Sequence, residues 1–341
     1  MNIEIITTPN AALIATGFGS LTACNSVLAS TKRAGHEGSI TLCNTIEDLE
    51  AVVLRKPDLV ILAVKHLPEE DNKKIWLSEY FAEHAVNFSG SSMASMRFDA
   101  DKVLAKTHLK AKGISTANFF TAVPGEHRRE SHLPIGFPLF LKPVNAVNSS
   151  GIDDDSLVRS YAAFESKVAS LYGRFQVPVL VEEYLEGPAF TVCVIKTASG
   201  ELLVSPVEII PELSFNGPRV LGEETKRDQA RGVKKIEDAT MKKQLIKLTI
   251  DIFIDLDIRD FGRIDFITNK NGHCFFMEAD LLPGMDTSSS SFPKAFEIEH
   301  NLSYESVVEL IVEEGLSRAP MISPLNNPIL ADQVPSRHLF V

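Results

Sequence analysis

The sequence has few cysteines, a deficit of positive charge and no long apolar run. Its four cysteines (Cys24, Cys43, Cys193 and Cys274) show no CxxC spacing, which indicates a reducing compartment and excludes a structural zinc site. The net charge of −11 argues against nucleic acid as a partner. No stretch reaches about 18 apolar residues and no signal peptide is recognisable, so we expect a cytoplasmic protein without a membrane span.

The length of 341 residues and the hydrophobic content of 44% predict two or three domains with real cores. In residues 1–90, strands alternate with helices around the apolar run LVILAV, which predicts a Rossmann-like α/β unit. The segment Gly17-Phe18-Gly19-Ser20 could be a phosphate loop. It lacks the third glycine and the downstream acid of a dinucleotide fingerprint, so an ordinary turn is favoured and a dehydrogenase is not expected.

Residues 262–284 contain the strongest local pattern, two strand-like runs around Asn271-Gly272. This dipeptide suits a two-residue type I′ turn, because both central residues need positive φ. Counting outward from that turn places Asp265 opposite Glu278 and Arg263 opposite Asp280, all on one face. The predicted other face is apolar and consists of Ile264, Phe266, Met277 and Ala279.

The polar face of this hairpin is electrostatically unusual. Opposed carboxylates on neighbouring strands repel each other, and Asp280 adds a third acid beside Asp265 and Glu278. Arg263 supplies one compensating charge, and a Mg²⁺ ion bound by carboxylate oxygens would supply more. A solvated hairpin face with scattered charges is the alternative. The convergence of three acids and one arginine just before Pro283-Gly284 favours the metal site.

Three of the lysines before this hairpin bear on its function. Lys102 and Lys106 lie four residues apart on a predicted helical face, where surface solvation explains them. Lys142 lies at the end of an apolar predicted strand and precedes a loop of small and polar residues that ends at Gly151. Such a loop can bind an anion through backbone N–H groups, and a plain hairpin is the equally weighted alternative.

The segment after residue 177 is read as a strand that ends in Glu182-Glu183, with Glu183 a solvated edge charge. Gly187-Pro188 would then turn the chain so that FTVCVI pairs back on that strand. Residues 211–234 are polar and rich in glycine, which predicts a long surface loop. The last 23 residues, 319–341, contain four prolines and are read as a tail.

The order and spacing of six motifs resemble the ATP-grasp superfamily, in its D-alanine–D-alanine ligase branch. The motifs are DKVLAK (101–106), FPLFLKP (137–143), VLVEEYLEG (179–187), VEIIP (207–211), GRIDF (262–266) and MEADLLPGM (277–285). The resemblance implies an α/β (α+β) ATP-grasp fold in three domains. We expect an N-terminal α/β domain at 1–90, a central lid subdomain at 91–177, a C-terminal catalytic domain at 178–318 and the tail at 319–341.

The same resemblance assigns contacts to ATP. Phosphate contacts are expected from Lys102, Lys142 and the loop around Ser149 and Ser150. Adenine contacts are expected from the side chain of Glu182, the backbone of Glu183 and Leu185, and the side chain of Met277. Two Mg²⁺ ions, which Mn²⁺ could replace, would be held by Asp265, Glu278 and Asp280. Arg263 and the amide N–H of Gly284 would stabilise an oxyanion.

Several positions depart from the family pattern. Asp280 replaces an asparagine, and Ala189 replaces the glutamate that contacts ribose. Cys24 stands where the family has the glutamate that binds the first substrate's ammonium, Asn148 stands where it has a serine, and SFNGPRV lacks its tyrosine. Ser289 and Ser290 are further candidates for substrate contact. The resemblance therefore implies an altered first-substrate pocket.

These observations predict an ATP-dependent carboxylate–amine ligase that works through an acyl phosphate. It would act on a small carboxylic acid and an amine such as an amino acid, without nucleic acid or membrane, and a homodimer is left open. One alternative is a divergent D-alanine–D-alanine ligase of peptidoglycan synthesis. The other is a nucleotide-binding protein without catalysis, which Ala189 favours and which the retained Arg263 opposes.

Overall fold

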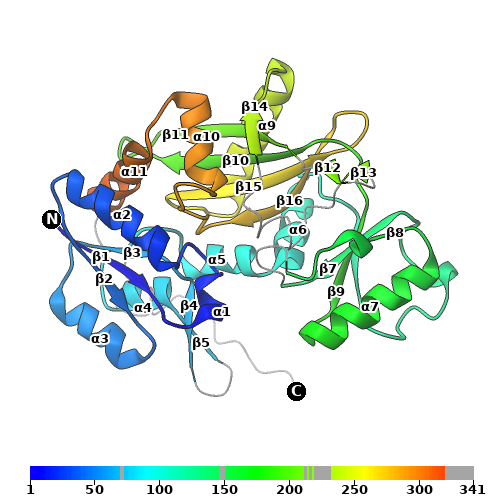
Figure 1. The fold of residues 1–341 in the computed structure, drawn as a ribbon, viewed down its shortest axis with the longest axis horizontal. Helices are drawn as coiled ribbons and strands as arrows, with labels where there is room; N and C mark the ends of the chain where they lie inside the picture. The colour runs from blue at the N-terminus through cyan, green and yellow to red at the C-terminus, as the bar shows by residue number, and fades with distance from the viewer. Residues whose placement is uncertain (70–72, 146–149, 211–212, 215–216, 219–231, 319–341) are drawn as a thin grey trace, which may run out of the picture.

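The structure is a computed structural model that describes residues 1–69, 73–145, 150–210, 213–214, 217–218 and 232–318. Figure 1 shows these residues gathered around a three-stranded, a four-stranded and a five-stranded sheet. Within this described part, no helix has the length and apolarity needed to cross a membrane. The tail 319–341 and most of the predicted loop 211–234 lie outside the described residues.

The N-terminal sheet is parallel, as the alternation of strands and helices predicted, with the order β2-β1-β3. The N-terminal unit consists of β1 (Asn2–Thr7), α1 (Ala11–Ile14), α2 (Leu21–Arg33), β2 (Glu37–Leu42), α3 (Ile46–Arg55), β3 (Leu59–Leu62), β4 (His66–Pro68), β5 (Lys74–Trp76) and α4 (Leu77–Glu83), of which β4 and β5 form a separate antiparallel pair. Thr45 caps α3 in a capping box with Asp48. The segment at Gly17 is a packing turn, since a Cβ there would lie 2.5 Å from the carbonyl oxygen of Ala63.

Two helices, α5 (Met93–Ala100) and α6 (Lys102–Ala111), follow the N-terminal sheet. They replace the single predicted helical stretch because Asp101 caps α6 by accepting a hydrogen bond from the N–H of Leu104. Both helices contact β16 of the five-stranded sheet, and Figure 1 shows them below that sheet. They therefore join the core of the catalytic sheet rather than that of the central sheet, where the sequence placed them.

The central sheet is antiparallel and has the order β6-β9-β7-β8. Its elements are β6 (Phe119–Ala122), β7 (Leu139–Pro143), β8 (Leu157–Val158), α7 (Tyr161–Phe175) and β9 (Val179–Glu183), with short 3₁₀ turns at Glu130–His132 and Asp154–Ser156. Because β9 pairs with β6 and β7, residues up to Glu183 belong to the central sheet.

The five-stranded sheet has the order β14-β11-β10-β15-β16. Its elements are β10 (Ala189–Lys196), β11 (Leu202–Ile210), β14 (Gly232–Lys235), α9 (Ala239–Asp255), β15 (Phe261–Thr268), β16 (Cys274–Asp280), α10 (Ser291–His300) and α11 (Tyr304–Ser317), and the short pair β12 (Leu213–Ser214) and β13 (Gly217–Pro218) lies outside it. The expectation that FTVCVI pairs back on the preceding strand is wrong. β10 pairs with β11 and β15 instead, so Gly187-Pro188 carries the chain from one sheet to the other.

Two hydrophobic cores hold this arrangement. One large core contains residues of the N-terminal sheet and of the five-stranded sheet together, from Ile3 to Val312. A smaller core belongs to the central sheet and α7, and includes Leu141, Phe164 and Val181. The N-terminal and five-stranded sheets thus share one apolar interior, whereas the central sheet packs on its own.

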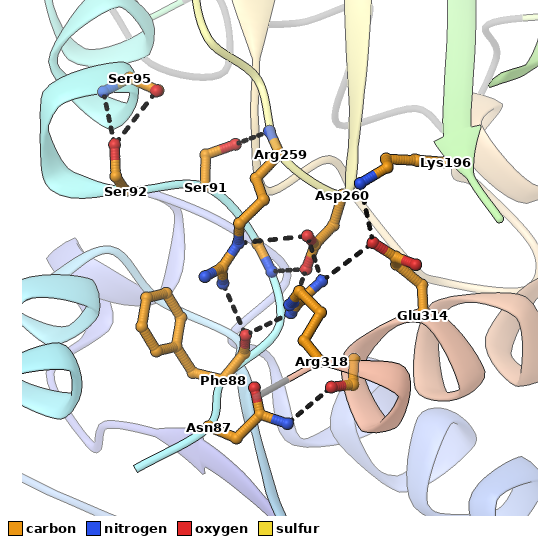
Figure 2. A network of polar contacts seen from close by, with 12 residues as sticks. Asn87, Phe88, Ser91, Ser92, Ser95, Lys196, Arg259, Asp260, Glu314 and Arg318 are labelled. Carbon is orange, nitrogen blue, oxygen red and sulfur yellow. Dashed lines mark hydrogen bonds and ion pairs between the residues drawn. The ribbon is translucent and has the colours of Figure 1, made fainter. Parts of the chain in front are cut away.

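A buried polar network closes the junction between the N-terminal segment, the start of β15 and the end of α11 (Figure 2). Asp260, 1% exposed, accepts hydrogen bonds from the N–H of Gly90 at 2.6 Å and from Arg318 at 2.5 and 2.9 Å. Arg318 and Arg259 both donate to the carbonyl oxygen of Phe88. The network fixes the residue that immediately precedes β15, the strand that carries Arg263 and Asp265.

Candidate active site

The polar face of the β15–β16 hairpin has the predicted pairing. Arg263 lies opposite Asp280, and Asp265 lies opposite Glu278. Arg263 donates to both carboxylate oxygens of Asp265 at 3.1 and 3.3 Å and lies 3.3 Å from Asp280. Thr191 on the neighbouring β10 also donates to Asp265, at 2.6 Å. The hairpin therefore carries an arginine held between two carboxylates.

This pairing arises by a different route from the predicted one. The loop contains three residues, because the N–H of Asn269 bonds to the carbonyl oxygen of His273 at 3.0 Å. Of the predicted turn dipeptide only Gly272 has positive φ, +76°, which suits a type I turn followed by a left-handed residue. A bulge opposite Asp265 and Phe266 then shifts the register by one residue. The two deviations cancel at the four polar positions.

The bulge changes the environment of Met277. Phe276, rather than Met277, pairs with Phe266 and is 1% exposed, whereas Met277 is half-buried. The prediction that Met277 shares the apolar face with Ile264, Phe266 and Ala279 is therefore wrong, because Phe276 takes that place opposite Phe266. Ile264, Phe266 and Ala279 are buried.

The charge of Arg263 is strongly favoured in this position. Burial opposes its charged form, but the attraction of Asp265, Asp280 and Glu278 outweighs burial and raises the pKa of Arg263 above its usual value. The same arginine relieves the repulsion between carboxylates that the sequence predicted. The side chain of Arg263 is 15% exposed.

A second cluster lies on the central sheet and α6. The carboxylate of Glu182, 1% exposed, is 2.6 Å from the Nζ of Lys106 and 2.8 Å from the Nζ of Lys142. Burial raises the pKa of Glu182, but the two ammonium groups outweigh burial and lower it to about 2. For Lys106, burial prevails and lowers the pKa, whereas Glu182 and Glu278 outweigh burial at Lys142 and raise it.

Lys102 connects the two clusters, because its Nζ lies 3.3 Å from Glu278 on β16. The combined constellation contains four cations and four carboxylates from three parts of the chain. They are Lys102, Lys106, Lys142 and Arg263, with Glu182, Asp265, Glu278 and Asp280. The site is therefore close to neutral, and each cation is already oriented by a carboxylate.

The strand end at Glu182-Glu183 differs from the prediction at Glu183. Glu182 is buried between lysines, and Glu183 is no free edge charge. The carboxylate of Glu183 accepts from the N–H of Asn118 at 2.9 Å and from its side chain at 3.1 Å, and its own N–H donates to the carbonyl oxygen of Asn118. At Gly187 a Cβ would lie 2.4 Å from the carbonyl oxygen of Thr268, so the crossing into β10 needs glycine.

The remaining predicted contact residues lie in different parts of the chain. Asn148 and Ser149 lie outside the described residues, and Ser150 is half-buried in the turn before Gly151. Cys24 is completely buried in the core, and burial raises the pKa of its thiol to about 11, which corrects the expectation that it contacts substrate. A Cβ on Gly284 would lie 2.7 Å from the Oγ of Ser290, which accepts a hydrogen bond from the N–H of Asp286.

Lys106 is the residue that sequence reasoning misassigned most clearly. It was read as solvated together with Lys102, yet Lys106 is 0% and Lys102 7% exposed. A signal was present, since Lys102 and Lys106 share their helical face with Ala105 and Leu109, which are buried. Thr191 gave no recognisable signal, because its role depends on strand pairing.

The carboxylates on the hairpin are the type of ligand that a divalent cation such as Mg²⁺ binds. Asp265, Glu278 and Asp280 offer only oxygen donors, which is the chemistry that Mg²⁺ prefers. Among the described residues, however, no three His, Cys, Asp or Glu side chains already converge as a metal-binding group. Arg263 and Lys102 hold these carboxylates instead, so a metal would have to replace some of those contacts.

Comparisons with known proteins show the family to which the chain belongs. Residues 108–313, more than half of the chain, match the family described as D-ala D-ala ligase C-terminus. A D-alanine--D-alanine ligase of Aquifex aeolicus is 28% identical over 295 residues, which cover 86% of this chain and 94% of that protein. Uncharacterized protein y4sG of Sinorhizobium fredii is 29% identical over 232 residues, 67% of this chain and 66% of that protein.

Solved structures show the same fold. The D-alanine--D-alanine ligase of Bacillus anthracis complexed with ATP superimposes with a TM-score of 0.71 at 21% identity, covering 93% of this chain and 97% of that one. The ligase of Coxiella burnetii gives 0.68 at 17% identity, with 94% of each chain covered. The chain therefore belongs to the D-ala D-ala ligase C-terminus family and is a D-alanine–D-alanine ligase-like member of the ATP-grasp superfamily.

Proposed function

We propose that this protein is an ATP-dependent, ADP-forming ligase that joins a carboxylic acid to an amine through an acyl phosphate. The observation that supports this most is the constellation of Lys102, Lys142, Arg263 and the three hairpin acids at one place. Joining a carboxylate to an amine requires an activated acyl group, and ATP can supply it. Lysines and an arginine can then neutralise the charge that spreads over the transferring phosphoryl oxygens.

Lys102 and Lys142 are proposed as the phosphate contacts. Both are more than nine-tenths buried, and each is oriented by a carboxylate, Glu278 and Glu182 respectively. Ordered ammonium groups bind a polyphosphate without first losing side-chain freedom. Ser149 and Ser150 remain proposed contacts from the adjoining loop.

For adenine we propose the carbonyl oxygen of Glu183 and the N–H of Leu185, with Met277 against the base. The N–H of Glu183 is excluded from this role because it bonds to Asn118. Glu182 is proposed as a positioning residue that orients Lys106 and Lys142 rather than as a direct adenine contact. Its two carboxylate oxygens each face one of these ammonium groups.

Asp265, Glu278 and Asp280 are proposed to hold two Mg²⁺ ions, which Mn²⁺ can replace. Bound there, the ions would neutralise charge on the phosphate oxygens. When nucleotide enters, Lys102 can exchange Glu278 for a phosphate, which frees that carboxylate. Arg263 then has room to leave Asp280 while it keeps its two hydrogen bonds to Asp265.

Arg263 and the N–H of Gly284 are proposed to stabilise the oxyanion that forms when the amine attacks the acyl group. Donors that are fixed before the reaction stabilise such a charge most effectively, because they need no reorganisation. Asp265 fixes Arg263 on its strand through two hydrogen bonds. Ser290, close to Gly284, is proposed together with Ser289 to contact the amine substrate.

The first substrate is proposed to differ from D-alanine. Asn148 and the tyrosine-free SFNGPRV segment support this, whereas the buried Cys24 can no longer be counted as a substrate contact. The second candidate is a divergent D-alanine–D-alanine ligase. It is favoured by the Aquifex aeolicus relative, which the similarity covers over 94% of its length.

The two candidates are separated by ADP release across a panel of amino and carboxylic acids, tested singly and in pairs with Mg²⁺ and ATP. We expect stoichiometric ADP and amide, detected by mass spectrometry, with a pair other than two D-alanines. Release with D-alanine alone would overturn the altered-substrate proposal and support the second candidate. Nucleotide binding without ADP release for any pair would contradict ligase chemistry altogether.

A further inference from the structure

A buried ion pair outside the constellation joins the N-terminal unit to α5. Lys65, between β3 and β4, places its Nζ 2.5 Å from Oδ1 of Asp99 in α5. Their side chains are only 6% and 7% exposed. Neither residue belongs to the phosphate, metal or oxyanion contacts proposed above, so the pair needs another explanation.

The second oxygen of Asp99 reaches the end of the catalytic hairpin. Oδ2 of Asp99 accepts a hydrogen bond from the N–H of Leu281 at 2.6 Å. Leu281 directly follows Asp280, and the N–H of Leu282 donates to Asp280 itself at 3.3 Å. Two carboxylates therefore hold the first two amides after β16, where the strand ends and the chain turns toward Gly284.

The segment that follows β16 packs closely against the N-terminal unit. Leu281 and Leu282 are 0% and 1% exposed. A Cβ on Gly17 would lie 3.2 Å from the Cβ of Leu282 and 2.5 Å from the carbonyl oxygen of Ala63. Packing restricts the leucine side chains, but it leaves the N–H of Leu281 in need of an acceptor, which Asp99 provides.

Stability alone is a poor explanation for this pair. Burying two charges costs desolvation, and apolar residues of similar volume in their place are often neutral or stabilising. An apolar pair could not accept the hydrogen bond from Leu281. The feature that distinguishes Asp99 from an apolar residue is thus its contact with the backbone next to Asp280.

We propose that Asp99, oriented by Lys65, is a positioning residue that fixes residues 281–284 and thereby the carboxylate of Asp280 and the N–H of Gly284. This inference rests on the ligase function proposed above. It couples the N-terminal unit to the catalytic hairpin, because Lys65 belongs to the first and Leu281 to the second. Displacement of this segment would weaken catalysis more than it weakens ATP binding through Lys102 and Lys142.

Two matched double variants test the inference, Lys65→Met/Asp99→Asn and Lys65→Met/Asp99→Leu. Both remove the ion pair and keep similar volumes, but only the asparagine retains an oxygen that can accept from Leu281. We expect kcat of the leucine variant to be at least tenfold below that of the asparagine variant, with KM for ATP within twofold. We also expect faster amide hydrogen exchange at Leu281, Leu282 and Gly284 in the leucine variant alone, measured on the free protein.

Glu4→Gln serves as the control, because Glu4 is a similarly buried carboxylate paired with Arg55 far from the hairpin. It is expected to lower Tm without changing kcat relative to wild type. Equal kcat and equal exchange in the two double variants would overturn the proposal. If wild type releases no ADP with any substrate pair, the proposed function fails, whereas the exchange measurement still decides whether Asp99 anchors the segment.

Discussion

Replacing Arg263 with alanine is expected to lower kcat by a factor of about 10² to 10³, the usual loss when one oxyanion donor is removed. Arg263 is the cation that the structure places between Asp265 and Asp280, at 3.1 and 3.3 Å. We expect the Kd for ATP to change only severalfold, since Lys102 and Lys142 keep their positions. Steady-state kinetics and calorimetric titration with a non-hydrolysable nucleotide measure the two effects separately.

Arg33→Ala is the control for this substitution. Arg33 also forms an ion pair with an acid, Glu305, but its side chain is 64% exposed, and such surface pairs contribute little. We expect wild-type kcat and Tm for this variant. Unchanged turnover in Arg263→Ala would remove the arginine from the chemistry and leave it a purely structural role.

The substitution Glu182→Gln is expected to lower the free energy of unfolding by about 3–5 kcal/mol, because it leaves two buried ammonium groups without a counter-charge. Glu182 is 1% exposed and touches both Lys106 and Lys142. Denaturant titration at neutral pH measures the loss. Glu183→Gln, one residue further, keeps an acceptor for Asn118 and is expected to cost less than about 1 kcal/mol.

The pH dependence of stability follows from the same carboxylate. Its pKa falls from the ordinary value of 4.5 to about 2 in the folded protein. A lowered pKa contributes stability above the unfolded value, and this contribution disappears as the pH falls from about 4.5 to about 2. The contribution is on the order of 3 kcal/mol, and it should be absent in Glu182→Gln. An identical acid-unfolding slope for wild type and variant would contradict the proposed buried pairing.

Much of the fold was predictable because local rules decided it. The apolar run LVILAV at 59–64 marked a buried parallel strand. The sequence also placed Arg263 opposite Asp280, although the assumed turn and the missed bulge were compensating errors. The strand pairing of β10 was not predictable, since a Gly-Pro step fits a hairpin and a crossing equally well.

The acids and the arginine of the site were predictable, but their partners were not. Period-two alternation put the hairpin charges on one face. Lys106 and Glu182 are buried where α6 meets the central sheet, through the ion pair between the two residues. No local sequence pattern encodes that contact. The link from Asp99 to Leu281 likewise joins residues 182 positions apart in the chain.

The central claim is that the hairpin acids bind the metal of a nucleotide held by Lys102 and Lys142. Crystals grown with Mn²⁺ and a non-hydrolysable ATP analogue, and measured for anomalous scattering, test it most directly. We predict anomalous peaks coordinated by Asp265, Glu278 and Asp280, with phosphate oxygens completing the coordination. Nucleotide bound at full occupancy, with these three carboxylates still held by Arg263 and Lys102 and no cation among them, would contradict the account.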